Sequence, residues 1–358
     1  MRIRTTLIFC LMILCLLAAN AVPAYAVDSA AIEAKIGQTA DYMQKTVVSP
    51  AYGSVGGEWL ILGLERSGLQ VQQSYFDAYY KSLLITLNQC GGVLHAKKYT
   101  EYSRVVLALT AMGKNPANVG GYNLLKPLAD FKKTTYQGVN GSAFALLALD
   151  SGDYQIPVNT DALVQATRQM YVDDLLSRQL ADGGFNLTGT VGDPDITAMV
   201  LQALANYRTQ DKVKPAVETA VAFLSDSQQT DGGYKSGGTV NTESVSQVII
   251  TLCQLGIDPA DSRFVKNGNT LLDNLAKYAL ENGGYCHLLS IQTANEMATE
   301  QAFCALVAYQ RFVKQQNTFY DMSDVLKRTN ALVFLWQKFL SDLKNSDSAK
   351  TRSLVHAE

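Results

Sequence analysis

Apolar residues recur along this chain at the three- and four-residue spacing of helices, and no segment shows the sustained alternation of a strand. The helical segments are of two kinds. Some carry a polar face with Lys, Gln and Asp, whereas others, such as residues 59–64 and 144–149, are apolar on nearly every side. A helix that is apolar all round is buried, and an amphipathic helix lies outside it. The pattern therefore predicts an all-α protein built from pairs of one outer and one inner helix.

These pairs repeat along the chain. Outer helices are expected near residues 29–46, 71–88, 121–133, 158–179, 212–229 and 268–281. Inner helices are expected near residues 57–67, 101–112, 140–151, 194–207, 243–255 and 296–313. Several inner segments end at a glycine, as helices commonly do: Gly68, Gly113, Gly152 and Gly256. From position 68 to position 256 is 188 residues, which over four steps gives about 47 per pair.

Alternating inner and outer helices favour a closed ring of inner helices wrapped by a ring of outer ones. An open solenoid of helix pairs is the alternative. A last helix over residues 322–343 is expected to pack across one end.

The first 26 residues have the pattern of a secretory signal peptide. Two arginines precede an apolar stretch over residues 7–19, and Ala24-Tyr25-Ala26 supplies small residues for cleavage. The apolar stretch is shorter than a membrane span requires, and no second stretch of this kind follows. We expect cleavage after Ala26, secretion, a folded body over residues 27–344 and a polar tail over residues 345–358. No membrane span is expected in the mature protein.

Charge and cysteine content limit the kinds of function and site that this chain can have. The chain has 30 basic and 32 acidic residues, and the signal takes two of the basic ones, so no basic surface for nucleic acid is expected. Four cysteines follow the signal, and an even number in an exported chain permits disulfides: Cys90, Cys253, Cys286 and Cys304. Cys253 and Cys304 lie on apolar helices and are expected to be buried free thiols. Cys286, in a loop, is the best candidate for a bridged or reactive thiol.

One plan recurs within residues 179–207, 228–256 and 280–309: a Gly-Gly-aromatic turn, a loop, an acidic helix start and an apolar helix. The spacing Phe223-Leu224-x-x-x-Gln228-x-x-x-Gly232-x-Tyr234 resembles the repeat motif of squalene–hopene cyclases. Leu175-x-x-x-Gln179-x-x-x-Gly183-x-Phe185 is similar, although Asp174 stands where that motif has an aromatic residue.

The chain thus resembles the squalene cyclase and protein prenyltransferase repeat superfamily, which includes cobalamin carriers of the transcobalamin type and exported bacterial relatives. The resemblance implies an (α/α)6 toroid with a central cavity.

The segment Asp193-Pro194-Asp195-Ile196-Thr197-Ala198 is similar to the Asp-x-Asp-Asp-Thr-Ala motif of class II terpenoid cyclases. That resemblance implies that Asp195 is a general acid with Asp193 beside it, but Ile196 replaces the third aspartate. Helix capping gives another explanation of the same residues. Asp193 suits the N-cap, Pro194 suits the first helical position, and Asp195 suits the positive end of the helix dipole.

Aromatic residues on the inner helices are candidates for the lining of a cavity, with packing in the core as the alternative: Trp59, Tyr102, Phe144 and Phe303. The zinc site of the prenyltransferase branch would need an Asp, a Cys and a His that converge. Only a Cys286–His287 neighbourhood with Glu296 or Glu300 offers such side chains, and the aspartate–cysteine pair is missing. We therefore expect no metal.

Three functions remain open. The first is binding of a large apolar or corrinoid-like ligand, or of a cell-surface partner protein, at the cavity or rim. The second is an enzyme of class II terpenoid-cyclase type with Asp195 as the acid, and the third is a structural toroid in a surface assembly. An aromatic cavity with Asp195 pointing inward favours catalysis, an open groove at the rim favours binding, and a filled centre favours a scaffold.

Overall fold

The computed structural model describes residues 29–329, 331 and 335, and the chain over these residues is mostly helical. Strand structure in this part is limited to the antiparallel pair β1 (Lys235–Ser236) and β2 (Thr239–Val240). No helix in the described residues is long and apolar enough to cross a membrane. The all-α class is confirmed, whereas the predicted signal peptide and the polar tail lie outside the described residues.

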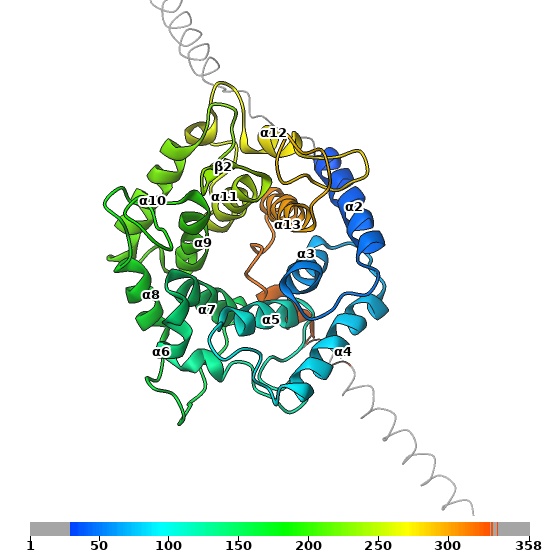
Figure 1. Ribbon diagram of the computed structural model, residues 1–358, viewed down its shortest axis with the longest axis vertical. Coiled ribbons are helices and arrows are strands. Elements are labelled where there is room, and N and C mark those ends of the chain that lie inside the picture. The colour runs from blue at the N-terminus through cyan, green and yellow to red at the C-terminus, as the bar shows by residue number, and fades with distance from the viewer. Residues whose placement is uncertain (1–28, 330, 332–334, 336–358) are drawn as a thin grey trace, which may run out of the picture.

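The segments predicted as inner helices are the most deeply buried helices of the molecule (Figure 1). They are α3 (Trp59–Ser67), α5 (Thr100–Ala111), α7 (Val139–Ser151), α9 (Pro194–Leu204), α11 (Thr242–Leu255) and α13 (Glu296–Val313). Each contacts the next in chain order, and α13 also contacts α3, so the contacts close into a cycle. We call these the inner helices.

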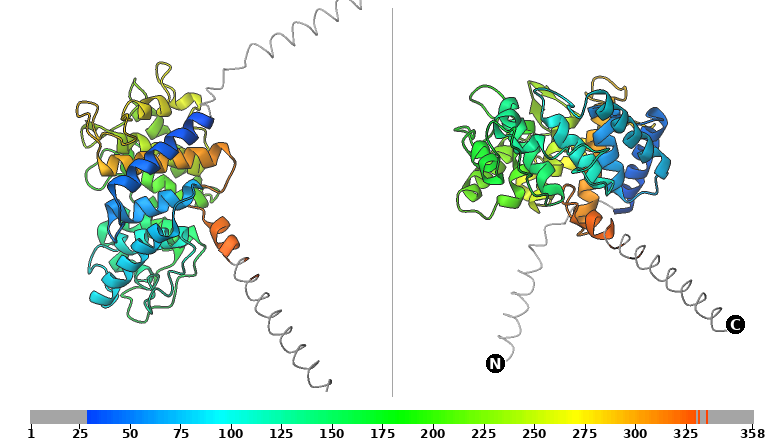
Figure 2. Two further views of the ribbon diagram at one scale, coloured as in Figure 1. Left: turned by 90° about the vertical axis from the view of Figure 1, so that its right-hand side faces the viewer. Right: turned by 90° about the horizontal axis from the view of Figure 1, so that it is seen from below.

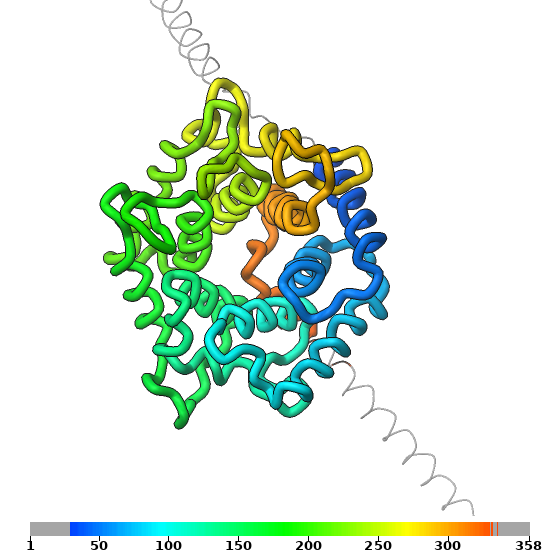
Figure 3. The backbone as a smooth tube through the Cα atoms, viewed as in Figure 1, coloured from blue at the N-terminus to red at the C-terminus, as the bar shows by residue number. Residues whose placement is uncertain are grey.

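The outer helices lie farther from the centre and alternate with the inner ones along the chain (Figure 3). They are α2 (Ser29–Thr46), α4 (Gln73–Gln89), α6 (Phe131–Thr134), α8 (Arg168–Leu176), α10 (Val213–Ser227) and α12 (Leu271–Ala276). Outer helices pack on inner neighbours, as α8 does on α7 and α10 does on α9. Short helical turns occur at Ser54–Glu58, Pro127–Ala129, Thr135–Gln137, Ala205–Tyr207 and Ser262–Phe264.

Several outer helices are shorter than predicted. The helix expected over residues 158–179 forms only as α8, because the Thr167 side chain caps it by accepting the Met170 backbone N–H. The residues before Thr167 form a loop in which the Asn159 backbone N–H donates to the Gln165 side chain. The helices expected over residues 121–133 and 268–281 are likewise reduced to α6 with a short turn and to α12.

Local capping fixes the ends of the inner helices. Three of them begin at a side chain that accepts a first-turn backbone N–H: Asp193 before α9, Asn241 before α11 and Asn295 before α13. Gly68 and Gly256 end α3 and α11 in the left-handed conformation, as predicted. Gly152 follows α7 with φ of −129°, so it does not serve as a left-handed stop.

The repeated glutamine of the cyclase-like motif has a structural role. The amide nitrogen of Gln228 donates to the carbonyl of Gly232 in its own turn and to the carbonyl of Phe264 in the following segment. Gln179 makes the equivalent pair of hydrogen bonds, to Gly183 and Ala216. The motif therefore ties each Gly-Gly turn to the next outer element, which explains its recurrence without any chemistry.

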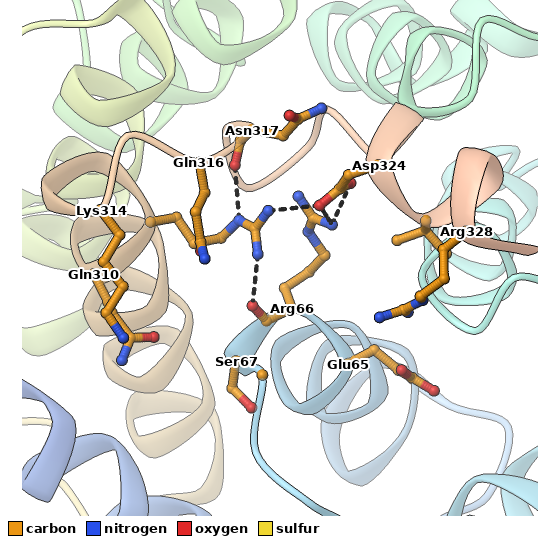
Figure 4. A pocket seen from close by; sticks show the side chains of 12 residues that line it. Glu65, Arg66, Ser67, Gln310, Lys314, Gln316, Asn317, Asp324 and Arg328 are labelled. Atoms are coloured by element: carbon orange, nitrogen blue, oxygen red, sulfur yellow. Dashed lines mark hydrogen bonds and ion pairs between the residues drawn. The ribbon is translucent and has the colours of Figure 1, made fainter.

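A segment after α13 crosses the far end of the inner helices and is held there by a buried arginine (Figure 4). Arg66 donates to the carbonyls of residues 318, 319 and 321 and to both carboxylate oxygens of Asp324. Arg311 donates to Asp324 as well, and to the carbonyl of Arg66. All three guanidinium nitrogens of Arg66 therefore donate to oxygens of this segment. Arg66 and Arg311 also line a hollow of about 500 Å³.

Residues 323–329 form the start of the predicted last helix and project from this far end (Figure 2). Val325 is buried there. The rest of that helix falls largely outside the described residues.

Candidate functional site

The first turns of the inner helices surround a cavity of about 480 Å³. Most of these helices contribute a pair of side chains four residues apart: Thr100 and Arg104, Asn140 and Phe144, Asp195 and Met199, Glu243 and Gln247, and Met297 and Gln301. Residues four apart lie on one face of a helix. Each inner helix therefore turns the same edge of its N-terminal end toward a shared centre, and the helix starts meet at one rim.

The opposite end of the cavity is closed by Tyr320. This residue belongs to the segment that Arg66 holds across the far end of the inner helices, where the chain passes through the middle of the view in Figure 1. Tyr320 is buried, with 5% of its surface exposed. The cavity is therefore approached from the rim at the helix starts.

Asp195 lies in the wall of this cavity, as the cyclase resemblance implies. Its Oδ1 is buried and has no hydrogen-bond partner among the described residues. Burial raises the pKa of Asp195 to about 6, the charges of Asp193 and Glu243 add to the rise, and the hydroxyls of Ser244 and Ser236 oppose it. Above that pKa the carboxylate form of Asp195 predominates.

Asp193 is the N-cap of α9. Its Oδ1 accepts the backbone N–H groups of Asp195 and Ile196, and its Oδ2 accepts the hydroxyl of Ser236 at 2.7 Å. The second contact fixes the β1–β2 hairpin against the start of α9. Asp193 is not among the residues that line the cavity, and all its contacts are structural.

The structure brings two of the four candidate aromatic residues to the cavity. Trp59 and Phe144 both line it, with ring centroids 5.9 Å apart. Tyr102 instead lines a separate hollow of about 580 Å³, where Tyr99 and Tyr122 also lie. Phe303 is fully buried in the core, packed so closely on Gly63 that a Cβ there would lie 2.8 Å from its ring.

Several cavity residues were not predicted from the sequence, among them a chain of three glutamines. Gln202 donates to the side-chain oxygen of Gln247 at 2.9 Å, and Gln247 donates to that of Gln301. Arg104 and Asn140 complete the polar wall. The sequence contained one signal for these residues. Each is a polar side chain on a mostly apolar helix, and each lies one turn before or after another residue of the cavity wall.

Two buried glutamates position a loop that contributes to the wall. The backbone N–H of Gly53 donates to Glu58 at 3.2 Å, and that of Gly56 donates to Glu300 at 2.6 Å. Between these anchors, residues 54–55 line the cavity. Glu58 and Glu300 are 1% and 3% exposed, and burial raises their pKa values to about 7 and about 8.

The cysteines and histidines do not assemble a metal site. No group of three or more metal-capable side chains occurs within the described residues. The four cysteines in the described residues are free, and Cys286, expected to be bridged or reactive, is buried, with the pKa of its thiol raised by that burial. His287 pairs through Nδ1 with Glu243 at 2.8 Å instead of joining Cys286 in a ligand set.

Comparison with protein-family models and with curated proteins returns no match for this chain. The geometry of the cavity is therefore the basis for any functional argument. It offers a carboxylate, a row of carboxamides and two aromatic rings. Such an arrangement can recognise a small molecule that has both polar and apolar parts.

Proposed function

We propose that this chain is a secreted (α/α)6 toroid of the squalene cyclase and protein prenyltransferase repeat type that binds a small molecule in its central cavity. The alternation of inner and outer helices and the closed cycle of inner-helix contacts support the toroid. The pattern of the first 26 residues supports secretion.

The observation that carries the binding proposal is the set of unpaired polar atoms in the cavity wall. Oδ1 of Asp195, Oδ1 of Asn140 and Nε of Arg104 are buried and have no hydrogen-bond partner among the described residues. A buried polar group without a partner costs about 1–3 kcal/mol. These atoms have almost no accessible surface, so a ligand recovers that energy when the wall side chains turn toward it.

The same wall argues against a wholly apolar ligand, which would leave these atoms unpaired. It also argues against an enclosed corrinoid. A volume of about 480 Å³ suits a compact small molecule, and a corrin macrocycle with its nucleotide exceeds it. A cell-surface protein would have to bind outside the cavity, at the rim. A toroid with a purely structural role does not need a polar cavity. The polar wall therefore also disfavours the hypothesis of a structural toroid in a surface assembly.

The test is native mass spectrometry of the mature protein, purified from its own secretome. We expect a small-molecule adduct that disappears on denaturation and is reduced in Met199→Trp, which fills the cavity. Glu218→Gln on the exposed surface of α10 is the matched control and should keep the adduct. Equal amounts of adduct in Met199→Trp and in the wild type would refute binding in the cavity. The proposal would also fail if the purified protein carries no adduct and its thermal unfolding temperature does not rise when culture medium is added.

A second candidate is an acid-catalysed terpenoid cyclase, because Asp195 lies in the cavity wall with a raised pKa. Ile196 also lines the cavity, at the place where the cyclase motif has its third aspartate. Incubation with squalene should distinguish the two functions. Cyclised product from the wild type and none from Asp195→Asn would establish the enzyme, and no product from either would leave binding as the function.

A further inference from the structure

The charge of the central cavity is unbalanced. Asp195 on α9 and Glu243 on α11 both line it, and these two inner helices are in contact. Glu243 is paired with Nδ1 of His287 at 2.8 Å, and this histidine is charged only when it is protonated. Arg104 is the one cation among the described residues of the lining. Its Nη2 is bound to Glu101, and its Nε lies 3.7 Å from Oε2 of Glu58. The positive charge is therefore neutralised by the protein itself.

Two of the buried unpaired atoms on the lining residues are acceptors. The amide nitrogens of Gln202 and Gln247 donate within the glutamine chain, to Gln247 and Gln301 respectively. Oδ1 of Asp195 and Oδ1 of Asn140 remain without a donor among the described residues. Nε of Arg104 is also without a hydrogen bond, but it is turned toward Glu58. The carboxylate of Asp195, which only accepts hydrogen bonds when ionised, therefore favours a ligand that donates them.

The aromatic pair points to the same ligand class. Trp59 and Phe144 line the cavity on helices α3 and α7, with a tilted arrangement of their rings. The face of an aromatic ring attracts a cation by about 0.5–2 kcal/mol, and tryptophan does so most strongly. Trp59 and Phe144 can also pack against the hydrocarbon part of a ligand.

We infer that the central cavity takes an organic ammonium compound, with its charged nitrogen at Asp195 and Glu243 and its hydrocarbon part against Trp59 and Phe144. This inference rests on the proposed function, since it names the class of ligand for the same cavity. The ammonium supplies hydrogen-bond donors for the carboxylate of Asp195. A neutral ligand of the same shape leaves the carboxylate of Asp195 uncompensated, and an anionic one is repelled.

Three probes of matched shape test the inference: 4-phenylbutylamine, 4-phenylbutan-1-ol and 4-phenylbutyrate. They differ only in their terminal group, which is cationic, neutral or anionic at neutral pH. Trp59 and Trp336 are the two tryptophans of the chain, so a Trp336→Phe background makes the intrinsic fluorescence report on the cavity. The mature protein is titrated with each probe in that background.

We expect the amine to bind at least about tenfold more tightly than the alcohol, which corresponds to about 1.4 kcal/mol, and the acid to bind most weakly. Asp195→Asn and Glu243→Gln should each reduce affinity for the amine and leave that for the alcohol unchanged. Glu218→Gln should change neither. Circular dichroism and thermal unfolding check that each variant folds. Acidification below pH about 6 should weaken amine binding as Asp195 becomes protonated.

These outcomes distinguish a failure of the cation inference from a failure of the proposed function. If the alcohol or the acid binds as tightly as the amine, the cation inference is wrong and the cavity remains a binding site. If none of the probes binds but native mass spectrometry finds an adduct, a cationic adduct supports the inference and a neutral or anionic one overturns it. If no probe binds and no adduct is found, the proposed function itself fails.

Discussion

Stability should depend on pH through the glutamates that anchor the loop at the cavity rim, and Glu300 provides the sharpest test. Its side chain is buried, and it accepts the backbone N–H of Gly56 at 2.6 Å. Replacement by glutamine in Glu300→Gln keeps the shape and an oxygen that can accept the same N–H. The substitution removes only the ability to ionise, so its effect on folding should vary with pH.

The magnitude follows from the pKa of Glu300, which burial raises from 4.5 to about 8. One pKa unit corresponds to about 1.4 kcal/mol, so ionisation in the folded state costs on the order of 5 kcal/mol. Because the folded protein binds this proton more tightly than the unfolded chain, the stabilisation is complete below pH about 4.5. It is lost as the pH rises to about 8.

The measurement is urea-induced unfolding of wild type and Glu300→Gln from pH about 5 to about 9. We expect the free energy of unfolding of the wild type to fall by several kcal/mol over this window and that of the variant to fall less. Near pH 9 the variant should therefore be the more stable protein. Burial also raises the pKa values of Glu58 and Glu65 to about 7 and that of Asp195 to about 6, so some slope should remain.

Glu218→Gln, on the exposed face of α10, is the control and should reproduce the wild-type slope. Two results would refute the reasoning. One is a wild-type protein that becomes more stable as the pH rises through this window. The other is a Glu300→Gln variant whose slope equals that of the wild type.

Two further predictions concern packing. A Cβ added at Gly141 would lie 2.0 Å from the carbonyl oxygen of Thr134, so Gly141→Ala should destabilise the protein by more than about 2 kcal/mol. Gly37→Ala on α2 is the matched control: its Cβ meets nothing within 4 Å, and the change should stabilise by up to about 1 kcal/mol. Equal effects in urea unfolding would contradict this account. Arg66→Met should cost about 2–4 kcal/mol, because it leaves the carbonyls of residues 318, 319 and 321 without this donor and Asp324 with Arg311 alone. A loss below about 1 kcal/mol would show that these hydrogen bonds are not needed.

The inner helices were predictable to within a few residues because their determinants are local. Their side chains are apolar on all faces, and caps such as Asp193 and stops such as Gly256 lie at their ends in the sequence. The outer helices α6, α8 and α12 were overestimated. In those segments the amphipathic pattern is weak, and side chains such as Thr167 and Thr270 start the helix later than periodicity suggests.

The candidate site was only partly predictable. Asp195, Trp59 and Phe144 were identified and do meet in one cavity. Tyr102 and Phe303 lie on the same set of inner helices but face other surroundings, because a helix apolar on every side gives no sign of which face turns to the centre.

The sequence by itself determined the helical class, the alternation of inner and outer helices, and the caps and turns, since these depend on residues close together in the chain. Only the tertiary structure decided which polar groups share the cavity. Arg104, Asn140, Asp195 and Glu243 come from four different helices, and their proximity depends on the angle at which each helix packs against its neighbours. That packing also decided the charge balance. Glu101 and Glu58 pair with Arg104, whereas Oδ1 of Asp195 has no hydrogen-bond partner among the described residues, and the proposal of a cationic ligand depends on this difference.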